Sequence, residues 1–275
     1  MRLQLLGTGA AEGIPAFLCD CRVCSTARRR RGREVRENSC AVVAGRGGET
    51  LLIDLPPQIK MAIDRYAVDQ DRLQAILVTH AHADHCLGLA YFPVRAVSRN
   101  GYCNPRMIDL CLPQSVQAFS ERLVGARLTV VDGDSPFRLR TARAYEPLAA
   151  GPFTITPLET GHIAGGECLG YLIEEEGSRL AYMLDSPSQL PERTLEHLLA
   201  RPVGCLVFDC TFDGAPIPSG HSNIEAVIAM HERVRPRVTV ASHVSHRCLD
   251  HRALRRRLRR QGIRVGFDGM TLTVP

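Results

Sequence analysis

The sequence contains no long apolar run. Hydrophobic residues make up 45% of its 275 positions, yet no segment approaches the roughly 20 consecutive apolar residues that a membrane-spanning helix needs. The N-terminal run, residues 1–7, is short and ends at a glycine, so it lacks the apolar core of a secretory signal peptide. The sequence therefore predicts a cytoplasmic protein that does not bind membranes.

Repeats and linkers are missing as well. The chain shows no self-similarity at solenoid periods, no low-complexity stretch and no segment of linker-like composition. A chain of 275 residues has ample material for a buried core. We therefore expect one domain that covers residues 1–275.

The signatures of nucleotide-binding loops are also absent. A glycine-rich segment, residues 7–15, follows the first strand-like run, but it has neither the Walker lysine nor GxGxxG spacing. Flexible backbone near a metal site accounts for these glycines, and no phosphate-binding loop is expected here.

The apolar runs predict many strands and fewer helices. In each half of the chain several strand-like runs precede the helical patterns, which indicates two sheets packed together with helices outside, an αββα sandwich of the α/β class. The predicted strands are 3–6, 40–43, 51–53, 75–79, 108–112, 128–131, 153–157, 170–174, 180–184, 205–209, 237–241 and 264–267. The predicted helices are 57–66, 113–123, 191–200, 223–235 and 251–261.

A cluster of metal-ligand side chains follows the run Ala75–Thr79. The next six residues, 80–85, read His-Ala-His-Ala-Asp-His, and imidazoles and carboxylates suit borderline divalent ions such as zinc, manganese or iron. A lone histidine is usually an ordinary packed or surface residue. Three histidines and an aspartate in six residues instead indicate a metal site at the end of a strand, where open α/β folds place their active sites.

Further ligands are expected from later strand ends. His162 follows the run 153–157, Asp185 follows 180–184, and His243 follows 238–242. A strand often ends on a polar residue for turn chemistry alone. The repetition of histidine or aspartate at each of these strand ends favours a shared metal site.

These residues resemble those of the metallo-β-lactamase superfamily, whose HxHxDH motif matches residues 80–85. The resemblance implies an αββα sandwich with a two-metal centre between the sheets. On this pattern His80, His82 and His162 would hold one metal, Asp84, His85 and His243 would hold the other, and Asp185 would bridge them. Two such cations lower the pKa of water and neutralise phosphate oxygens. Because aspartate stands where β-lactamases have cysteine, no β-lactamase activity is expected.

The cysteines form a second signal. Of the 11 in the chain, most are scattered and predict free buried thiols in a reducing compartment. Cys19, Cys21 and Cys24 instead form a CxCxxC cluster in one loop, and sulfur-rich clusters typically bind zinc. His246 is the candidate for the fourth ligand.

This cluster narrows the resemblance to the phosphoribosyl cyclic phosphodiesterases of the carbon–phosphorus lyase pathway. Segments 7–15, 19–24, 79–80, 242–246 and 265–270 carry the similarity. It implies a homodimer with two divalent ions, preferably Mn²⁺ (Zn²⁺ or Fe²⁺ as alternatives), and one structural Zn²⁺ on Cys19, Cys21, Cys24 and His246. The substrate implied is a small phosphorylated sugar, 5-phosphoribosyl 1,2-cyclic phosphate, which is opened to ribose 1,5-bisphosphate.

Two residues receive catalytic roles from this resemblance. Asp84 would orient the attacking water, and His221, which precedes a predicted helix, would protonate the departing sugar oxygen. His221 has an alternative interpretation as part of the N-terminal cap of that helix, beside Ser222 and Asn223.

Other functions remain open at this point. Arginine runs at 28–36 and 252–260 contribute to a net charge of +5, and we interpret them as solvated helix faces; nucleic acid is not an expected partner. The first run and the segment 95–106 depart from the family pattern, which leaves the substrate open. The alternatives are an RNA-processing or cyclic-nucleotide phosphodiesterase, a pyrroloquinoline-quinone-biosynthesis-type protein, and a non-catalytic metal carrier.

Overall fold

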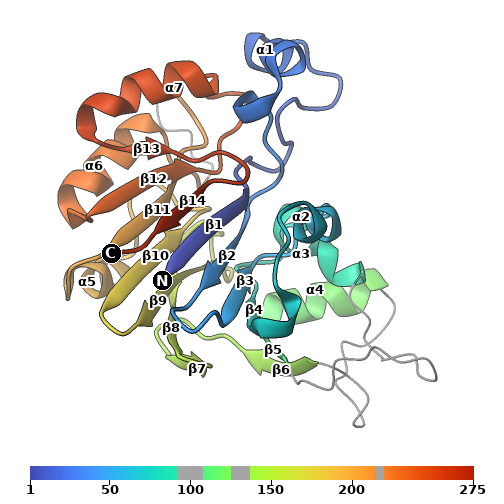
Figure 1. Ribbon diagram of the computed structural model, residues 1–275, viewed down its shortest axis with the longest axis vertical. Helices are drawn as coiled ribbons and strands as arrows, with labels where there is room; N and C mark the ends of the chain where they lie inside the picture. Colours follow the sequence, from blue (N-terminus) through green and yellow to red (C-terminus); the bar gives the residue numbers. More distant parts are fainter. Residues whose placement is uncertain (92–107, 125–136, 215–219) are drawn as a thin grey trace.

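The computed structural model describes residues 1–91, 108–124, 137–214 and 220–275. Its strands form two seven-stranded sheets that pack face to face (Figure 1). Helices cover the two outer faces, so the predicted αββα sandwich is confirmed. Among the described residues no helix has both the length and the apolar character that crossing a bilayer requires.

The first sheet has the strand order β14-β1-β2-β3-β4-β5-β6. Strands β14, β1, β2 and β3 pair antiparallel, whereas β3 to β6 run parallel. The bounds are β1 Arg2–Gly7, β2 Cys40–Ala44, β3 Thr50–Ile53, β4 Leu73–Leu77, β5 Ile108–Leu112, β6 Phe137–Thr141 and β14 Thr271–Thr273.

The second sheet repeats this plan in the order β13-β12-β11-β10-β9-β8-β7. Here β7 to β10 pair antiparallel, and β10 to β13 run parallel. The bounds are β7 Leu148–Ala150, β8 Phe153–Glu159, β9 Leu169–Glu175, β10 Ser178–Met183, β11 Cys205–Asp209, β12 Val238–Ser242 and β13 Arg264–Val265.

Helices lie on both sides of the sandwich. Figure 1 shows α2 (Ile59–Arg65), α3 (Ala83–Cys86) and α4 (Gln114–Val124) beside the first sheet. It shows α5 (Glu192–Leu199), α6 (Ile224–Val234) and α7 (His251–Leu258) beside the second. Helix α1 (Arg22–Arg30) lies at the top of the view, near α7.

Alternation within each strand explains why the strands look uniformly apolar in sequence. In β3, Leu51 and Ile53 join the core between the sheets, while Leu52 packs outward with α2 residues such as Ile59. In β10, Tyr182 faces the inner core and its neighbours face the helices of the second sheet. A strand buried on both faces has no polar side, so its sequence is a continuous hydrophobic run.

The structure also differs from the predicted elements in places. Strands β6, β7 and β14 and helices α1 and α3 were not predicted. The predicted strand 128–131 and the divergent segment 95–106 lie outside the described residues. The five predicted helices occur as α2, α4, α5, α6 and α7, each with ends within about two or three residues of its predicted bounds, as is usual for helix ends. The free-thiol prediction holds for the described cysteines, none of which forms a disulfide.

Candidate metal centre

The predicted ligands gather where strands of both sheets end. His80 lies three residues after β4, and the short helix α3 that follows carries Asp84 and His85. From the second sheet, Asp185 follows β10 and His243 follows β12 directly. Parallel strands end at the same edge of a sheet, and a hydrogen bond from Leu169 N to Thr79 O joins the two sheets at this point.

One set of side chains faces one oxygen of Asp185. His80 Nε2 lies 3.9 Å from Asp185 Oδ1, and His162 Nε2 lies 3.8 Å from the same oxygen. His82 Nδ1 is 3.3 Å from His162 Nε2. The ligand atoms of these four residues all lie within 4.8 Å of one another, which is close enough to hold a single ion.

A second set faces the other oxygen of Asp185. His85 Nε2 and His243 Nε2 lie 3.1 and 3.4 Å from Asp185 Oδ2. Asp84 Oδ2 lies 3.2 Å from His85 Nε2 and 3.9 Å from His243 Nε2. The two oxygens of Asp185 therefore lie next to two different ligand sets, which is the arrangement that a bridging carboxylate requires.

Several atoms of these sets are buried without a hydrogen-bond partner. They are His80 Nε2, His85 Nε2, His243 Nε2 and Asp185 Oδ2, and all take part in the short distances given above. A buried polar atom without a hydrogen-bond partner lowers the stability of the fold by about 1–3 kcal/mol. Four such atoms in one place indicate that a bound group contacts all of them. Imidazole nitrogens and carboxylates are donors for borderline divalent cations. The residues present fit two such ions, with Asp185 between them.

Two histidines of the first set are also in the protonation state that binds metal ions. Burial lowers the pKa of His80 well below its ordinary value and lowers the pKa of His162 as well. Both rings are therefore neutral at pH 7, and neutral imidazole is the form that binds metals.

The second set holds protons that cations would displace. Burial lowers the pKa of His243, but the carboxylates of Asp185, Asp84 and Asp209 outweigh it and raise this pKa to about 9. Burial of Asp185 is likewise outweighed by His243 and His85, which hold the pKa of its carboxyl well below the usual range. The site thus carries ionised carboxylates, and metal binding would release protons from the imidazoles.

Two buried aspartates orient the histidines, and the sequence analysis missed both. Asp54 follows β3; its Oδ1 accepts hydrogen bonds from Thr79 N and Thr79 Oγ1 at 2.8 and 2.9 Å. Its Oδ2 lies 2.8 Å from His85 Nδ1. Thr79 Oγ1 is in turn 3.0 Å from His80 Nδ1. Partners on the far nitrogen of a ligating imidazole fix its orientation and tautomer.

The second sheet repeats this arrangement around Asp209, the last residue of β11. Asp209 Oδ1 accepts hydrogen bonds from Thr211 N and Thr211 Oγ1 at 3.0 and 2.8 Å. Thr211 Oγ1 lies 3.0 Å from His243 Nδ1. Asp54 and Asp209 both stand at the end of an apolar strand, as Asp185 does, so the signal that identified Asp185 was present for them too.

Strained backbone marks the same positions. Asp54, Asp185 and His243 have φ values of 63°, 48° and 56°. Left-handed conformations of residues other than glycine cost about 1–3 kcal/mol each and persist where the surroundings hold them in place. Three of them in one cluster show that the fold is organised around these side chains.

His221 lies at the edge of the centre. Its Nδ1 is 2.9 Å from Asp209 Oδ2 and 3.9 Å from Asp185 Oδ1. The N-cap of α6 is Asn223, whose Oδ1 accepts a hydrogen bond from Ala226 N at 2.8 Å. A capping role therefore does not account for His221, whose ring is held by Asp209 against the metal centre.

A cavity of about 160 Å³ opens onto the centre. His82, Asp84, Asp185 and His221 form part of its wall. Arg247 stands at its exposed side, with its guanidinium carbon 5.0 Å from the centre of the Phe212 ring. Arg247 could not be predicted from the sequence, because a single arginine in a loop carries no distinguishing pattern.

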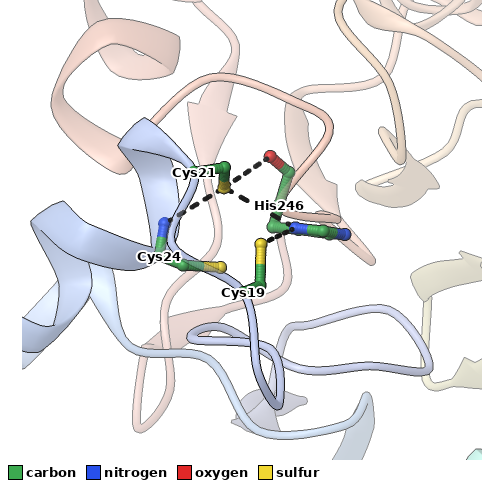
Figure 2. Close-up of side chains that lie close together, drawn as sticks. All are labelled: Cys19, Cys21, Cys24 and His246. Carbon is green, nitrogen blue, oxygen red and sulfur yellow. Dashed lines mark hydrogen bonds between the residues drawn. The ribbon is translucent and has the colours of Figure 1, made fainter.

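The cysteine cluster forms a separate site beside this centre. Figure 2 shows Cys19, Cys21 and Cys24 around the ring of His246. Cys19 Sγ and Cys21 Sγ lie 3.2 and 3.6 Å from His246 Nδ1, and the four ligand atoms all lie within 4.8 Å of one another. Three sulfurs and an imidazole in this arrangement could hold one tetrahedral zinc ion.

Zinc binding at this cluster should depend on pH. Burial raises the pKa of Cys21, but hydrogen bonds from Cys24 N and His246 outweigh it and lower this pKa to about 6. Thiolate is the ligating form, and it is lost as the pH falls through that value. We therefore expect zinc affinity, measured by competition with a chelator, to fall more steeply below about pH 6 than above it. An affinity that does not change between pH 7 and pH 5 would contradict this expectation.

The cysteine cluster and the metal centre share one loop. His243 and His246 are three residues apart, and Arg247 follows directly. Glu12 Oε1 accepts a hydrogen bond from Ser245 Oγ at 2.6 Å and lies 3.4 Å from His246 Nε2. The cysteine cluster therefore anchors the loop that carries a ligand and the cavity arginine.

A family model for the beta-lactamase superfamily domain matches residues 51–244. This match covers more than half of the chain, and the fold and the site agree with it. The chain belongs to the metallo-β-lactamase superfamily, and with its divalent-metal ligand sets it is a metal-dependent hydrolase of that class.

The individual relatives have several different activities. A PhnP-family diphosphatase of known structure is 26% identical, with a TM-score of 0.80 over 100% of this chain and 98% of that one. The coenzyme PQQ synthesis protein B of Methylobacterium radiotolerans is 31% identical over 77% of this chain and 73% of that protein. Ribonuclease Z of Streptomyces coelicolor is 31% identical over 62% of this chain and 52% of its own length. This chain spans only 35% of an octanoyltransferase of Porphyromonas gingivalis, to which it is 28% identical.

Proposed function

We propose that this protein is a two-metal phosphodiesterase that hydrolyses a small cyclic phosphate, 5-phosphoribosyl 1,2-cyclic phosphate, to ribose 1,5-bisphosphate in phosphonate degradation. The observation that carries the proposal is the placement of Asp185 between two complete ligand sets. Mn²⁺ is the proposed occupant of both sets, with Zn²⁺ or Fe²⁺ as alternatives, and Zn²⁺ is proposed for the cysteine cluster.

The size of the cavity supports a small substrate. At about 160 Å³ it is smaller than the roughly 300–1,000 Å³ typical of pockets that enclose whole drug-sized ligands. It can receive a phosphate group and part of a sugar, while the rest of the substrate lies at the mouth beside Arg247.

The residues of the chain can be given roles in this reaction. Water attacks the phosphorus atom, the bond from phosphorus to sugar O2 breaks, and O2 takes up a proton, so that the phosphate stays on O1. When bound, the two cations would ionise the water and neutralise the phosphate oxygens. Asp84 accepts a hydrogen bond from the attacking water, and His221, oriented by Asp209, gives its proton to O2.

His221→Ala should lower kcat by about 10²- to 10⁴-fold, the usual contribution of general acid catalysis. His221 lies close enough to Asp185 and His243 for the three to hold an ion. Its Nδ1, however, is 2.9 Å from Asp209 Oδ2, and it belongs to neither of the two proposed ligand sets, so the metal content per chain should stay unchanged. Steady-state kinetics and elemental analysis of the same preparation measure both quantities. Unchanged turnover, or loss of an ion, would remove His221 from the role of acid.

Arg247→Ala should raise KM about 10- to 100-fold for a substrate with a second phosphate, since a charge-assisted hydrogen bond is lost. The kcat value should change little, and bis(p-nitrophenyl) phosphate, which has no second phosphate, serves as the control substrate. Arg247→Lys should restore part of the affinity. An equal rise of KM for both substrates would show that Arg247 does not bind the second phosphate.

A substrate panel tests the proposed function itself. The metal-loaded protein is assayed with bis(p-nitrophenyl) phosphate, cyclic nucleotides, the ribosyl cyclic phosphate and a precursor tRNA. We expect the highest kcat/KM with the ribosyl cyclic phosphate. Inactivity on every small diester, or a preference for the tRNA, would overturn the proposal.

We also propose that the protein forms a homodimer. Phe17 and Leu18, next to the cysteine cluster, are each 89% exposed, and a subunit contact there would bury this apolar pair. Sedimentation should then give twice the chain mass of 30.3 kDa, and a monomer at micromolar concentration would refute it.

A further inference from the structure

The two arginine runs come together in space. The first begins in the last turn of α1 and continues past its end, and the second lies on α7 and the 3₁₀ turn Arg259–Gln261 that follows it. Figure 1 shows α1 and α7 at the same end of the molecule. Between them is a cavity of about 510 Å³, which we call the arginine cavity. The arginines that line it are Arg30, Arg31, Arg33, Arg252, Arg255, Arg256 and Arg259.

The charges of the arginine cavity are not neutralised. Among the described residues, none of its seven arginines forms an ion pair, whereas their neighbour Arg257 pairs with Glu225. Glu34 is the one carboxylate in the described lining, and its Oε2 already accepts a hydrogen bond from His251 N at 2.8 Å. Seven unpaired guanidinium groups around one hollow repel one another, and an anion placed there would relieve the repulsion.

Side-chain contacts hold His251 and Arg33 in the wall of the arginine cavity. His251 is buried, and Arg36, also buried, donates to its Nδ1 at 3.2 Å. Arg36 donates further hydrogen bonds to Thr8 Oγ1 and Gly266 O. Arg33 is fixed over the ring of Phe267, 4.1 Å from its centre. Burial, with a further contribution from the charges of Arg36, Arg33 and Arg255, lowers the pKa of His251 to about 4.

The lining indicates the chemistry of the ligand. No phenylalanine, tyrosine or tryptophan lines the described wall of the arginine cavity, although single-stranded nucleic acids are held by stacking bases on such rings. Its volume lies within the range of pockets for small molecules. Planar guanidinium groups bind phosphate oxygens in pairs. A compact ligand rich in phosphate fits these features, and an extended strand does not.

We propose that the arginine cavity binds a short chain of linked phosphates, supplied either by a nucleoside triphosphate or by inorganic polyphosphate. The site is separate from the proposed catalytic one, because the two cavities share no lining residue. Arg33, Arg255 and Arg259 also line a second hollow of about 330 Å³, which is not part of the proposed site and whose wall includes Phe267, with Arg33 stacked over its ring.

A matched pair of variants tests this proposal. Arg259 lines both hollows, whereas Arg260, the next residue in the same 3₁₀ turn, lines neither. Arg259→Glu and Arg260→Glu change the net charge equally and leave the metal centre intact. Binding of sodium tripolyphosphate to the metal-loaded protein is measured by calorimetry at about 150 mM salt, with metal content checked afterwards because the probe chelates metals.

We expect one tripolyphosphate per arginine cavity, a Kd raised at least about ten-fold by Arg259→Glu, and a change below about two-fold for Arg260→Glu. Should Arg259→Glu fold poorly, the double variant Arg255→Gln and Arg259→Gln replaces it. ATP is titrated in parallel: tighter binding than tripolyphosphate identifies the nucleotide as the source, and weaker binding identifies polyphosphate.

Three results would overturn the proposal. One is the absence of saturable binding of both probes, and another is an equal effect of the Arg259 and Arg260 variants. The third concerns a single-stranded RNA of about 16 nucleotides. If this RNA binds more than about ten-fold tighter than tripolyphosphate, and Arg259→Glu weakens its binding, the ligand is an extended strand.

Discussion

Asp185→Asn is expected to abolish hydrolysis, with kcat/KM reduced at least about a thousand-fold. The asparagine side chain has nearly the same shape, but it is uncharged and has one acceptor oxygen in place of two. Because Asp185 Oδ1 faces His80 and His162 while Oδ2 faces His85 and His243, the variant cannot serve both ligand sets. Elemental analysis should show fewer divalent ions per chain than in the parent protein.

Asp109→Asn is the matched control for this experiment. Asp109 is also a buried aspartate, but its oxygens pair with Arg138 and Arg140 of β6, the strand next to its own in the first sheet. Its replacement should leave the metal content and kcat unchanged, even where some stability is lost. An Asp185→Asn protein that keeps both ions and its activity would contradict the bridging role.

Cys24→Ala is expected to have the largest effect on stability. Cys24 is fully buried, and Ala16 N donates a hydrogen bond to its sulfur at 3.2 Å. Structural zinc contributes directly to folding, so loss of one ligand should lower the free energy of unfolding by more than about 3 kcal/mol and release one zinc per chain. Turnover should fall as well, because the cluster anchors the loop with His243 and Arg247.

Cys205→Ala provides the comparison for this variant. Cys205 is an equally buried free cysteine in β11 and lies outside the cluster. Its replacement removes one sulfur atom from the core and should cost only about 1 kcal/mol, without loss of zinc. Chemical denaturation and zinc analysis of both variants distinguish the two effects. Equal destabilisation, with zinc retained by both variants, would show that the cysteine cluster binds no structural metal.

The sequence was sufficient to predict the αββα sandwich and the side chains that gather at the metal centre. The reason is local: each of His80, Asp185 and His243 follows an apolar strand within a few residues, and parallel strands bring such ends together. Asp54 and Asp209 carry the same signal in the sequence, an aspartate at the end of an apolar strand, but their role of orienting the histidines depends on how neighbouring strands pair. Asp54 reaches Thr79 and His85 only because β3 pairs parallel with β4.

The strands and helices that were not predicted from the sequence also depend on contacts with other parts of the chain. Strand β14 has only one buried apolar residue, Leu272. It forms a strand because it pairs antiparallel with β1 at the edge of the first sheet. Helix α1 is only nine residues long, and the side chains of its buried face, Val23, Cys24, Thr26 and Ala27, are small or only weakly apolar. The arginine runs could be read as exposed helix faces, but their meeting around one cavity depends on the tertiary structure.

We propose that Asp185 lies between two divalent ions. Anomalous diffraction from crystals of the manganese-loaded protein would locate both ions and their ligands. We predict two manganese peaks about 3.5–4 Å apart, one beside Asp185 Oδ1 with His80, His82 and His162, and one beside Oδ2 with Asp84, His85 and His243. A single peak, or two peaks that Asp185 does not touch, would contradict the account.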